Sequence, residues 1–190
     1  MDMKIIGTSI GLMAGLAACA TPLPSPSNLT AAITRNANGE RVVRVVAISR
    51  QSPEVVWRAF SSEAALRCWI APVVRLDLRV GGSLQTNYTP SAKIGDAGTI
   101  TLGIVNYVEN EFITYKVRLN ESFSPTVRAQ DDRLQQVIQL QRLANGGTKL
   151  VASMVGWGNG AEWDRAAAFF VEGNKIGIDQ LAKCVANGGS

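Results

Sequence analysis

The fold is decided by residues 156–185, whose sequence is GWGNGAEWDRAAAFFVEGNKIGIDQLAKCV. Three glycines open this stretch, and from there to about Val185 the apolar residues recur at helical spacing. One face of the expected helix carries Trp163, Ala167, Phe170, Asn174, Ile178, Leu181 and Val185. The pattern therefore predicts a long C-terminal helix with one mostly apolar face.

The residues before this helix predict strands and two short helices. Ser52-Pro53-Glu54 supplies an N-cap, a first-turn proline and an acid for the first helix, and the second runs from near Ser62 to before Pro72. Strands are expected at 41–49, 74–80, 84–88, 98–108, 112–119, 134–143 and 148–155, with a hairpin at 81–82 and a loop at 120–132. Strand runs with the helices set apart favour an α+β domain.

Composition excludes several classes of protein. The chain has 190 residues, 46% hydrophobic and 18% charged, with a net charge of +4 spread along its length. This is a globular composition, and no basic stripe indicates nucleic-acid binding. Because the chain has no histidine, Ser-His-Asp and Cys-His catalysis and His-ligated metals are excluded. With three scattered cysteines and no Cys-x-x-Cys motif, we expect no structural metal site.

The N-terminal segment, residues 1–19, has the features of a targeting signal. Ile5 to Ala18 is apolar but shorter than the roughly 20 residues that span a membrane. It ends in Leu16-Ala17-Ala18-Cys19, which resembles the bacterial lipobox, where the cysteine is lipidated. Cleavage after Ala20 and an uncleaved anchor are the alternatives. We expect a lipid anchor at Cys19 in the cell envelope, facing the periplasm, and Ala20 after the cysteine favours the outer membrane.

The following residues, 20–40, are interpreted as a Pro-rich tether. Three prolines in residues 20–27 favour an extended polyproline II conformation. A spacer of about ten residues would hold the folded domain, expected at 41–187, roughly 30 Å from its anchor.

Five short motifs carry a resemblance to a known superfamily. They are SPEVVWRAF at 52–60, WIAP at 69–72, RVGG at 79–82, GGT at 146–148 and GWG at 156–158. In this order the chain from Arg41 to Asn187 resembles the START/Bet v 1-like (SRPBCC) superfamily, within it the branch similar to the Hsp90 ATPase activator C-terminal domain. The resemblance implies a helix-grip fold, in which a curved antiparallel sheet of about seven strands wraps the long C-terminal helix and often encloses an apolar cavity.

The resemblance also implies a range of functions. Members bind lipids, sterols, hormones or polyketides, and some are cyclases or hydrolases, so the fold alone does not select one. We expect a protein that binds a small apolar or amphipathic ligand between sheet and helix, without a cofactor, rather than an enzyme. A cyclase- or hydrolase-like enzyme and a co-chaperone-like interaction module are the alternatives.

Candidate ligand-binding residues are aromatic, with one amide. Those on the expected sheet or last helix are Tyr88, Tyr115, Trp163, Phe170 and Asn174, and those on the two short helices are Trp57 and Trp69. Relatives often carry Gly-Trp where this chain has Gly173-Asn174. The missing indole would leave space or place an amide in the cavity, unless Asn174 faces solvent.

Charged residues provide weaker candidates. Asp77, Glu109 and Glu111 are the nearest to an acid–base set, but they fit a solvated surface better and form no convincing pair. Arg44 and Arg118 could hold a ligand carboxylate, although exposed strand arginines are common. Cys68 and Cys184 could form a disulfide in an oxidising compartment, and nothing local in the sequence places them together.

Overall fold

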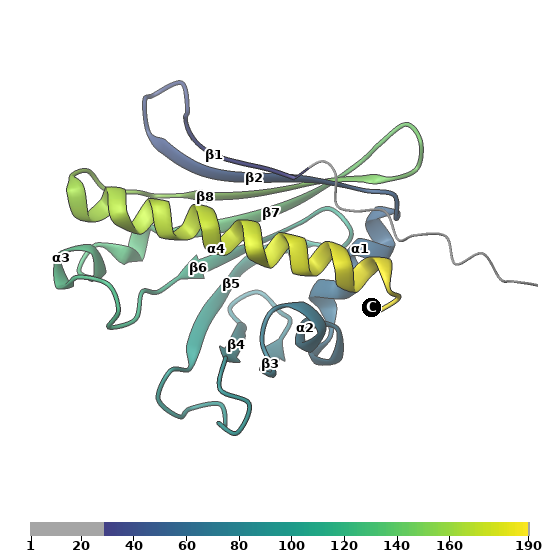
Figure 1. Ribbon diagram of the computed structural model, residues 1–190, viewed down its shortest axis with the longest axis horizontal. Coiled ribbons are helices and arrows are strands. Elements are labelled where there is room, and N and C mark those ends of the chain that lie inside the picture. The colour runs from purple at the N-terminus through teal and green to yellow at the C-terminus, as the bar shows by residue number, and fades with distance from the viewer. Residues whose placement is uncertain (1–28, 190) are drawn as a thin grey trace, which may run out of the picture.

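The computed structural model describes residues 29–189. In these residues a single sheet is crossed by a long C-terminal helix (Figure 1). The elements, in chain order, are β1 (Thr30–Arg35), β2 (Arg41–Ser49), α1 (Pro53–Ser61), α2 (Glu63–Trp69), β3 (Val73–Asp77), β4 (Ser83–Asn87), β5 (Ile100–Val108), β6 (Phe112–Val117), α3 (Pro125–Arg128), the 3₁₀ turn η1 (Asp131–Arg133), β7 (Gln135–Arg142), β8 (Thr148–Val155) and α4 (Ala161–Ala186).

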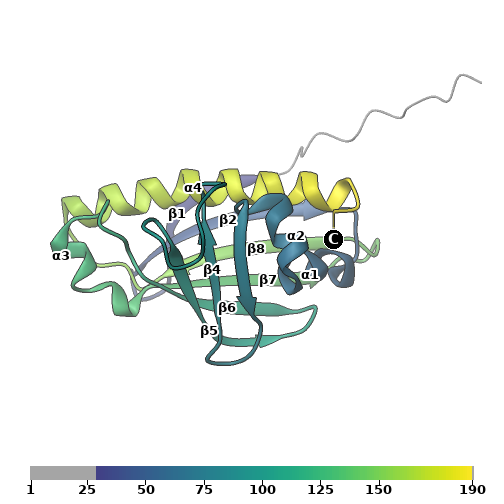
Figure 2. The same cartoon turned by 90° about the horizontal axis from the view of Figure 1, so that it is seen from below.

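The sheet is antiparallel throughout, with strand order β1-β2-β8-β7-β6-β5-β4-β3. It is curved and unclosed, and α4 runs along one of its faces while α1 and α2 cover one end (Figure 2). The expected α+β helix-grip architecture is confirmed. Among the described residues, no helix combines the length and apolar composition needed to cross a membrane.

The sheet has eight strands, because β1 adds an edge strand that the sequence analysis did not expect. β1 pairs with β2 from Thr30↔Val46 to Arg35↔Arg41, so the sheet begins inside the range 20–40 that was interpreted as a tether. A turn closes the hairpin, with the Asn36 side-chain oxygen accepting from the backbone N–H groups of Asn38 and Glu40. The Asn38-Gly39 pair is a strong hairpin signal, and Gly39 has a positive φ of 77°.

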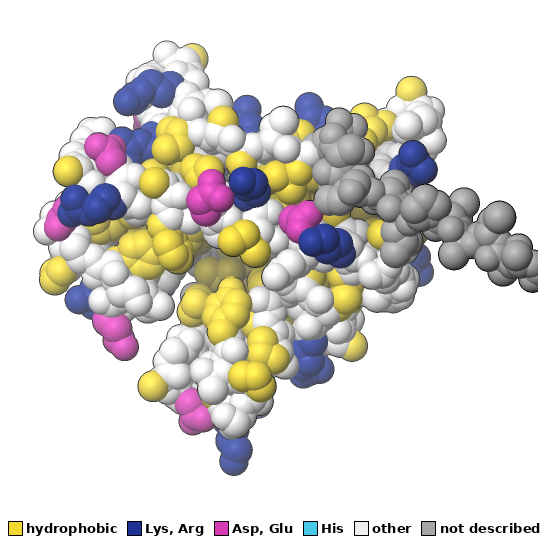
Figure 3. Space-filling model, viewed as in Figure 1, with side chains coloured by type: hydrophobic (Ala, Val, Ile, Leu, Met, Phe, Trp, Pro, Cys, Tyr) yellow, Lys and Arg dark blue, Asp and Glu magenta, His cyan; other side chains and the backbone are white. Residues whose placement is uncertain are grey.

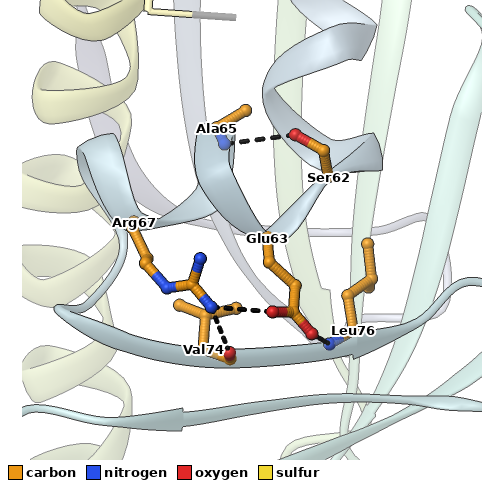
Figure 4. A network of polar contacts seen from close by, with 6 residues as sticks. All are labelled: Ser62, Glu63, Ala65, Arg67, Val74 and Leu76. Carbon is orange, nitrogen blue, oxygen red and sulfur yellow. Dashed lines mark hydrogen bonds and ion pairs between the residues drawn. The ribbon is translucent and has the colours of Figure 1, made fainter.

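Helix α2 is fastened to β3 by a small polar network (Figure 4). The Ser62 hydroxyl caps α2 by accepting from the Ala65 N–H at 3.2 Å. The Glu63 carboxylate accepts from the Leu76 N–H at 3.1 Å and pairs with Arg67 at 2.7 Å. Arg67 also donates to the Val74 carbonyl at 3.1 Å, so two side chains of one helix hold the edge strand.

Two segments differ from their expected structure. β3 ends at Asp77 rather than continuing to Val80, which is 63% exposed. The turn between β3 and β4 therefore spans more residues than Gly81-Gly82. Backbone hydrogen bonds from the Arg79 N–H to the Asp77 carbonyl and from the Gly82 N–H to the Arg79 carbonyl form it. The expected loop at 120–132 contains α3 and η1, and the Ser124 hydroxyl accepts from the Val127 N–H at the start of α3.

The hydrophobic core consists of two separate clusters. One includes Phe60, Leu66, Ile138 and Ile178, and it lies between α1, α2, the C-terminal half of α4 and the sheet. The other, at the N-terminal half of α4, is formed by Val43, Val117, Leu119, Val127, Leu134, Met154, Trp157, Trp163, Ala166 and Ala167. The closest backbone neighbours of α4 are β1, β2 and the three other α-helices, not the strands from β4 to β8. The central part of α4 therefore leaves space above those strands.

Candidate functional site

A cavity of about 780 Å³ occupies the space between α4 and the sheet. Its floor is formed by β4 to β8, and one wall by the middle of α4. The sheet contributes Leu84, Thr86, Ile100, Leu102, Tyr115, Val117, Gln136, Ile138 and Ala152. The lining includes members of both core clusters, so the cavity lies where the two clusters separate.

The mouth of the cavity is visible as a hollow below α4, with hydrophobic side chains on both sides (Figure 3). Three lining side chains at this mouth are largely exposed, namely Tyr88 at 61%, Phe169 at 61% and Ile176 at 57%. Phe123 completes this side by stacking on Phe170 at 5.6 Å. An apolar rim leading into an apolar interior is a feature of ligand-binding and interaction sites.

Small residues in the middle of α4 are the reason that the space stays open. Gly173 and Gly177 both line the cavity, and a Cβ atom added to either would meet nothing within 4 Å. Each glycine costs about 1 kcal/mol of helix propensity relative to alanine. Asn174 lies between them on the lining, so this part of the helix wall has no large apolar side chain at positions 173, 174 and 177.

Three polar groups inside the cavity have no partner in the protein. They are the Tyr115 hydroxyl, the Gln136 Nε2 and the Asn174 Nδ2, and all three atoms are buried. Tyr115 and Gln136 face each other across the β6–β7 ladder, and Asn174 comes from the helix wall. Burial raises the pKa of the Tyr115 phenol far above its usual value of 10.0, so the phenol stays protonated at neutral pH.

Charged side chains are confined to the rim of the cavity. The Arg118 guanidinium is paired with Asp131 at 2.6 Å, and its side chain is 55% exposed. Arg165 is more exposed still, and Glu162 accepts a hydrogen bond from the Ser124 hydroxyl at 2.8 Å. Among the described residues, the acidic and basic side chains on the lining are Arg118, Glu162 and Arg165.

Five of the seven predicted ligand residues line the cavity. They are Tyr88, Tyr115, Phe170, Asn174 and Trp69, and the last also donates from its indole to the Ala59 carbonyl at 2.9 Å. Asn174 lines the cavity with its amide nitrogen buried, so the alternative that it faces solvent is wrong. Whether any of the five contacts a ligand stays a prediction.

The other two predicted residues, Trp57 and Trp163, lie in the core and do not line the cavity. Trp57 stacks on Tyr107 with ring centroids 6.0 Å apart. Trp163 packs edge-on against Trp157 at 6.1 Å, and a Cβ atom on Gly158 would clash with its Nε1. Helical spacing indicates which face a residue occupies, but it does not distinguish the filled ends of α4 from its open centre.

The weaker charged candidates lie apart from the interior. Asp77 pairs with Arg79 at 3.0 Å, and Glu109 and Glu111 are exposed at the β5–β6 turn. Arg44 is exposed on β2, where it contacts Ser153 at 3.3 Å, and Arg118 already holds Asp131. The three carboxylates are therefore not assembled as an acid–base set.

Gln136 is one of the lining residues absent from the predicted set, and its buried amide makes it the most informative of them. It lies on the same face of β7 as Ile138 and Leu140, and all three are buried. A glutamine that interrupts the buried face of an alternating strand is a signal that could have identified it.

A disulfide between Cys68 and Cys184 fastens α2 to the end of α4, with Cα atoms 5.9 Å apart. The two cysteines lie 116 positions apart in the sequence, which is why no local pattern placed them together. Trp69, next to Cys68, lines the cavity, so the bridge holds one end of the cavity wall in place.

The curved sheet, the single long helix and the cavity between them define a helix-grip protein. Residues 50–186 match the family model described as "Activator of Hsp90 ATPase homolog 1-like protein", and the chain belongs to this family. No curated protein sequence matches the chain.

Solved structures share the fold at low sequence identity. Protein MLL2253 from Mesorhizobium loti is 20% identical with a TM-score of 0.61, and the match covers 77% of this chain and 98% of that one. CalU16 from Micromonospora echinospora is 15% identical with a TM-score of 0.57, covering 86% and 85%. The Aha1 dimer from Colwellia psychrerythraea is 14% identical with a TM-score of 0.52, covering 73% and 97%. These likenesses concern the fold alone.

Proposed function

We propose that the domain binds a small, mostly apolar molecule in the cavity between the sheet and α4. The observation that carries this proposal is the cavity itself, whose volume of about 780 Å³ falls within the roughly 300–1,000 Å³ of typical small-molecule sites. Its interior is apolar apart from a few polar groups that have no partner in the protein. Such groups orient a ligand, while the apolar walls provide most of the binding free energy.

The expected affinity is moderate. A ligand of ~20 heavy atoms at ~0.3 kcal/mol per atom gains about 6 kcal/mol, which corresponds to a Kd of tens of micromolar. This range suits a protein that loads and releases its ligand.

Binding is better supported than catalysis by the residues of the interior. Tyr115 is the ionisable residue of the floor, and its pKa is raised by burial, away from the range in which a general acid or base works near neutral pH. The carboxylate on the lining, Glu162, is at the rim and held by Ser124.

Mass spectrometry of small molecules that purify with the full chain from its native host tests the proposal. We expect one compound, or a set of related compounds, at near-stoichiometric amounts in the wild type. The same compounds should be depleted in Asn174→Trp, which places an indole in the cavity, and retained in Ala168→Trp on the exposed side of the same helix. Equal recovery from all three proteins would contradict a ligand in this cavity.

We further propose that the protein is anchored by a lipid on Cys19 and faces the periplasm, with the outer membrane as the favoured site. Cys19 lies outside the described residues, so the support comes from its sequence context and from one structural feature. The Cys68–Cys184 bridge is characteristic of oxidising compartments, which include the periplasm. Ten residues then separate Cys19 from Thr30, where the sheet begins.

Detergent phase partitioning tests the anchor. The wild type should enter the detergent phase, and Cys19→Ala should move to the aqueous phase, since the variant lacks the thiol that accepts the acyl chain. The double variant Cys68→Ser/Cys184→Ser serves as the control, because it removes the other two cysteines and leaves Cys19 in place. A wild type that stays in the aqueous phase with an unmodified Cys19 would refute lipidation.

A further inference from the structure

The three unpartnered polar groups occupy two walls of the same cavity. Tyr115 and Gln136 are directly opposite on β6 and β7, so their side chains rise from neighbouring points of the sheet floor. Asn174 reaches the cavity from α4, which covers that floor. We propose that Tyr115, Gln136 and Asn174 form a hydrogen-bonding subsite for an uncharged oxygen of the ligand, such as a ketone, ester or hydroxyl oxygen; the inference rests on the ligand-binding function proposed above.

The hydrogen-bonding capacity of these groups determines the chemistry. The unpartnered atoms are a phenol hydroxyl and two amide nitrogens, and the amide nitrogens donate only. The phenol donates as well, since burial keeps it protonated. The matching group on the ligand is therefore an acceptor.

Because the three polar groups are buried, leaving them without a hydrogen-bond partner costs free energy. Most buried polar side-chain atoms in proteins have a hydrogen-bond partner, and an unpartnered one is costly. Tyr115 is 4% exposed and Gln136 9% exposed, so both lie under the helix. A ligand oxygen placed between the two walls would satisfy donors that the fold leaves free.

The charges of the lining determine that the oxygen is neutral. The basic side chains on the lining are Arg118 and Arg165, and both are at the rim with most of the side chain exposed. Arg118 is also neutralised by Asp131. A carboxylate or phosphate beside Tyr115 would be buried without a countercharge, which is strongly unfavourable.

Matched probes separate these contributions. Fluorene, fluorenone and fluorenecarboxylate share one ring system and differ in carrying no acceptor, a neutral carbonyl oxygen or an ionised carboxylate. Their affinities for the full chain are measured by displacement of Nile red. Because a carbonyl accepts two hydrogen bonds, each worth about a fivefold gain, we expect fluorenone to bind at least about tenfold more tightly than fluorene. Fluorenecarboxylate should bind more weakly than fluorenone.

Single substitutions test whether the preference for fluorenone over fluorene comes from Tyr115, Gln136 and Asn174. Tyr115→Phe, Gln136→Met and Asn174→Leu each remove the polar group at similar volume, and we expect at least two of them to reduce the ketone preference about fivefold. Tyr115→Phe removes a single atom, so it tests the subsite without disturbing the fold. Tyr107→Phe is the matched control, since its hydroxyl donates to the Leu78 carbonyl at 3.3 Å outside the cavity, and its preference should equal that of the wild type.

The outcomes distinguish the two proposals. If fluorene and fluorenone bind equally, cavity water rather than a ligand oxygen satisfies the three groups, and the subsite is overturned while ligand binding stands. If neither probe displaces Nile red and no compound purifies with the protein, the proposed function itself fails. Preferential binding of the carboxylate would overturn the neutral character of the subsite.

Discussion

At the scale of single residues, Asn174 is the position that separates an open cavity from a filled core. Its amide nitrogen is buried without a partner, and the glycines on either side leave open space. A larger apolar side chain at position 174 would extend into the cavity. The same side chain at position 168 would lie on the exposed side of the helix, away from the cavity.

Asn174→Trp is therefore expected to weaken Nile red binding at least fivefold without loss of stability. Removing an unpartnered donor and filling a void should stabilise the fold by about 1 kcal/mol, or raise Tm by roughly 2–4 °C. Fluorescence titration and thermal melting measure both effects, and Ala168→Trp should change neither binding nor Tm. A clearly lower Tm would mean that the core is already full there, because overpacking typically costs about 1–3 kcal/mol.

Two of the predicted residues that line the cavity have a clear signal in the sequence. Asn174 interrupts an apolar helical stripe, and Tyr115 lies on a strand that had to face the helix. Trp57 and Trp163 do not line the cavity, and the sequence could not show this, because an apolar aromatic residue has the same spacing whether it fills the core or borders a cavity. That difference is decided by packing between α4 and distant strands, which periodicity does not contain.

At the scale of elements, α2 and β3 show how a short helix stabilises the edge of the sheet. The pKa of Glu63 is held below its ordinary value of 4.5, chiefly by the hydrogen bond from the Leu76 N–H; burial opposes this effect, and Arg67 and Arg75 add to it. A carboxylate whose pKa is lower in the folded than in the unfolded state stabilises the fold above the unfolded value. That contribution is lost as the pH falls through the folded pKa.

Glu63→Gln should consequently lower Tm at pH 7 and lose its effect in acid. The glutamine oxygen can still accept from Leu76, but the pair with Arg67 is lost, and for half-exposed groups this costs about 0.5–1 kcal/mol. The melting curves of variant and wild type should begin to converge as the pH falls below 4.5 and coincide below the lower folded pKa, where the native carboxyl is neutral too. Glu109→Gln, at the exposed β5–β6 turn, is the control and should match the wild type at each pH. A difference that persists unchanged in acid would rule out the carboxylate as its source.

Strands and helices could be predicted where apolar and polar residues alternate with a regular period. They could not be predicted where the main signal was a turn or a helix cap. The short helices and β4 to β8 came from periodicity. β1 is an edge strand with mostly exposed residues, so its hydrophobic alternation is weak, and Asn38-Gly39 was its clearest mark. α3 is one turn long, and its Ser124-Pro125 start was the available signal.

At the scale of the whole molecule, the disulfide joins the second helix to the last one and closes a long loop. For cysteines 116 positions apart, the chain-entropy model gives a stabilisation of about 5 kcal/mol, and disulfides typically contribute about 2–4 kcal/mol. Reduction should therefore lower the wild-type Tm by several degrees, measured by melting with and without reductant. The double variant Cys68→Ser/Cys184→Ser should melt at the reduced temperature and be insensitive to reductant. A wild type with equal Tm in both conditions would contradict the bridge.

The same bridge limits how far the domain can be stretched. If the protein is pulled by its two ends, the chain between Cys68 and Cys184 is bypassed by the sulfur–sulfur bond and carries no tension. In an oxidised molecule the force then extends only β1, β2, α1, most of α2 and the last few residues, while β3 to β8 lie inside the bridged loop and are not pulled. Reduction would release 116 further residues, a gain in contour length of about 400 Å at ~3.4 Å per residue.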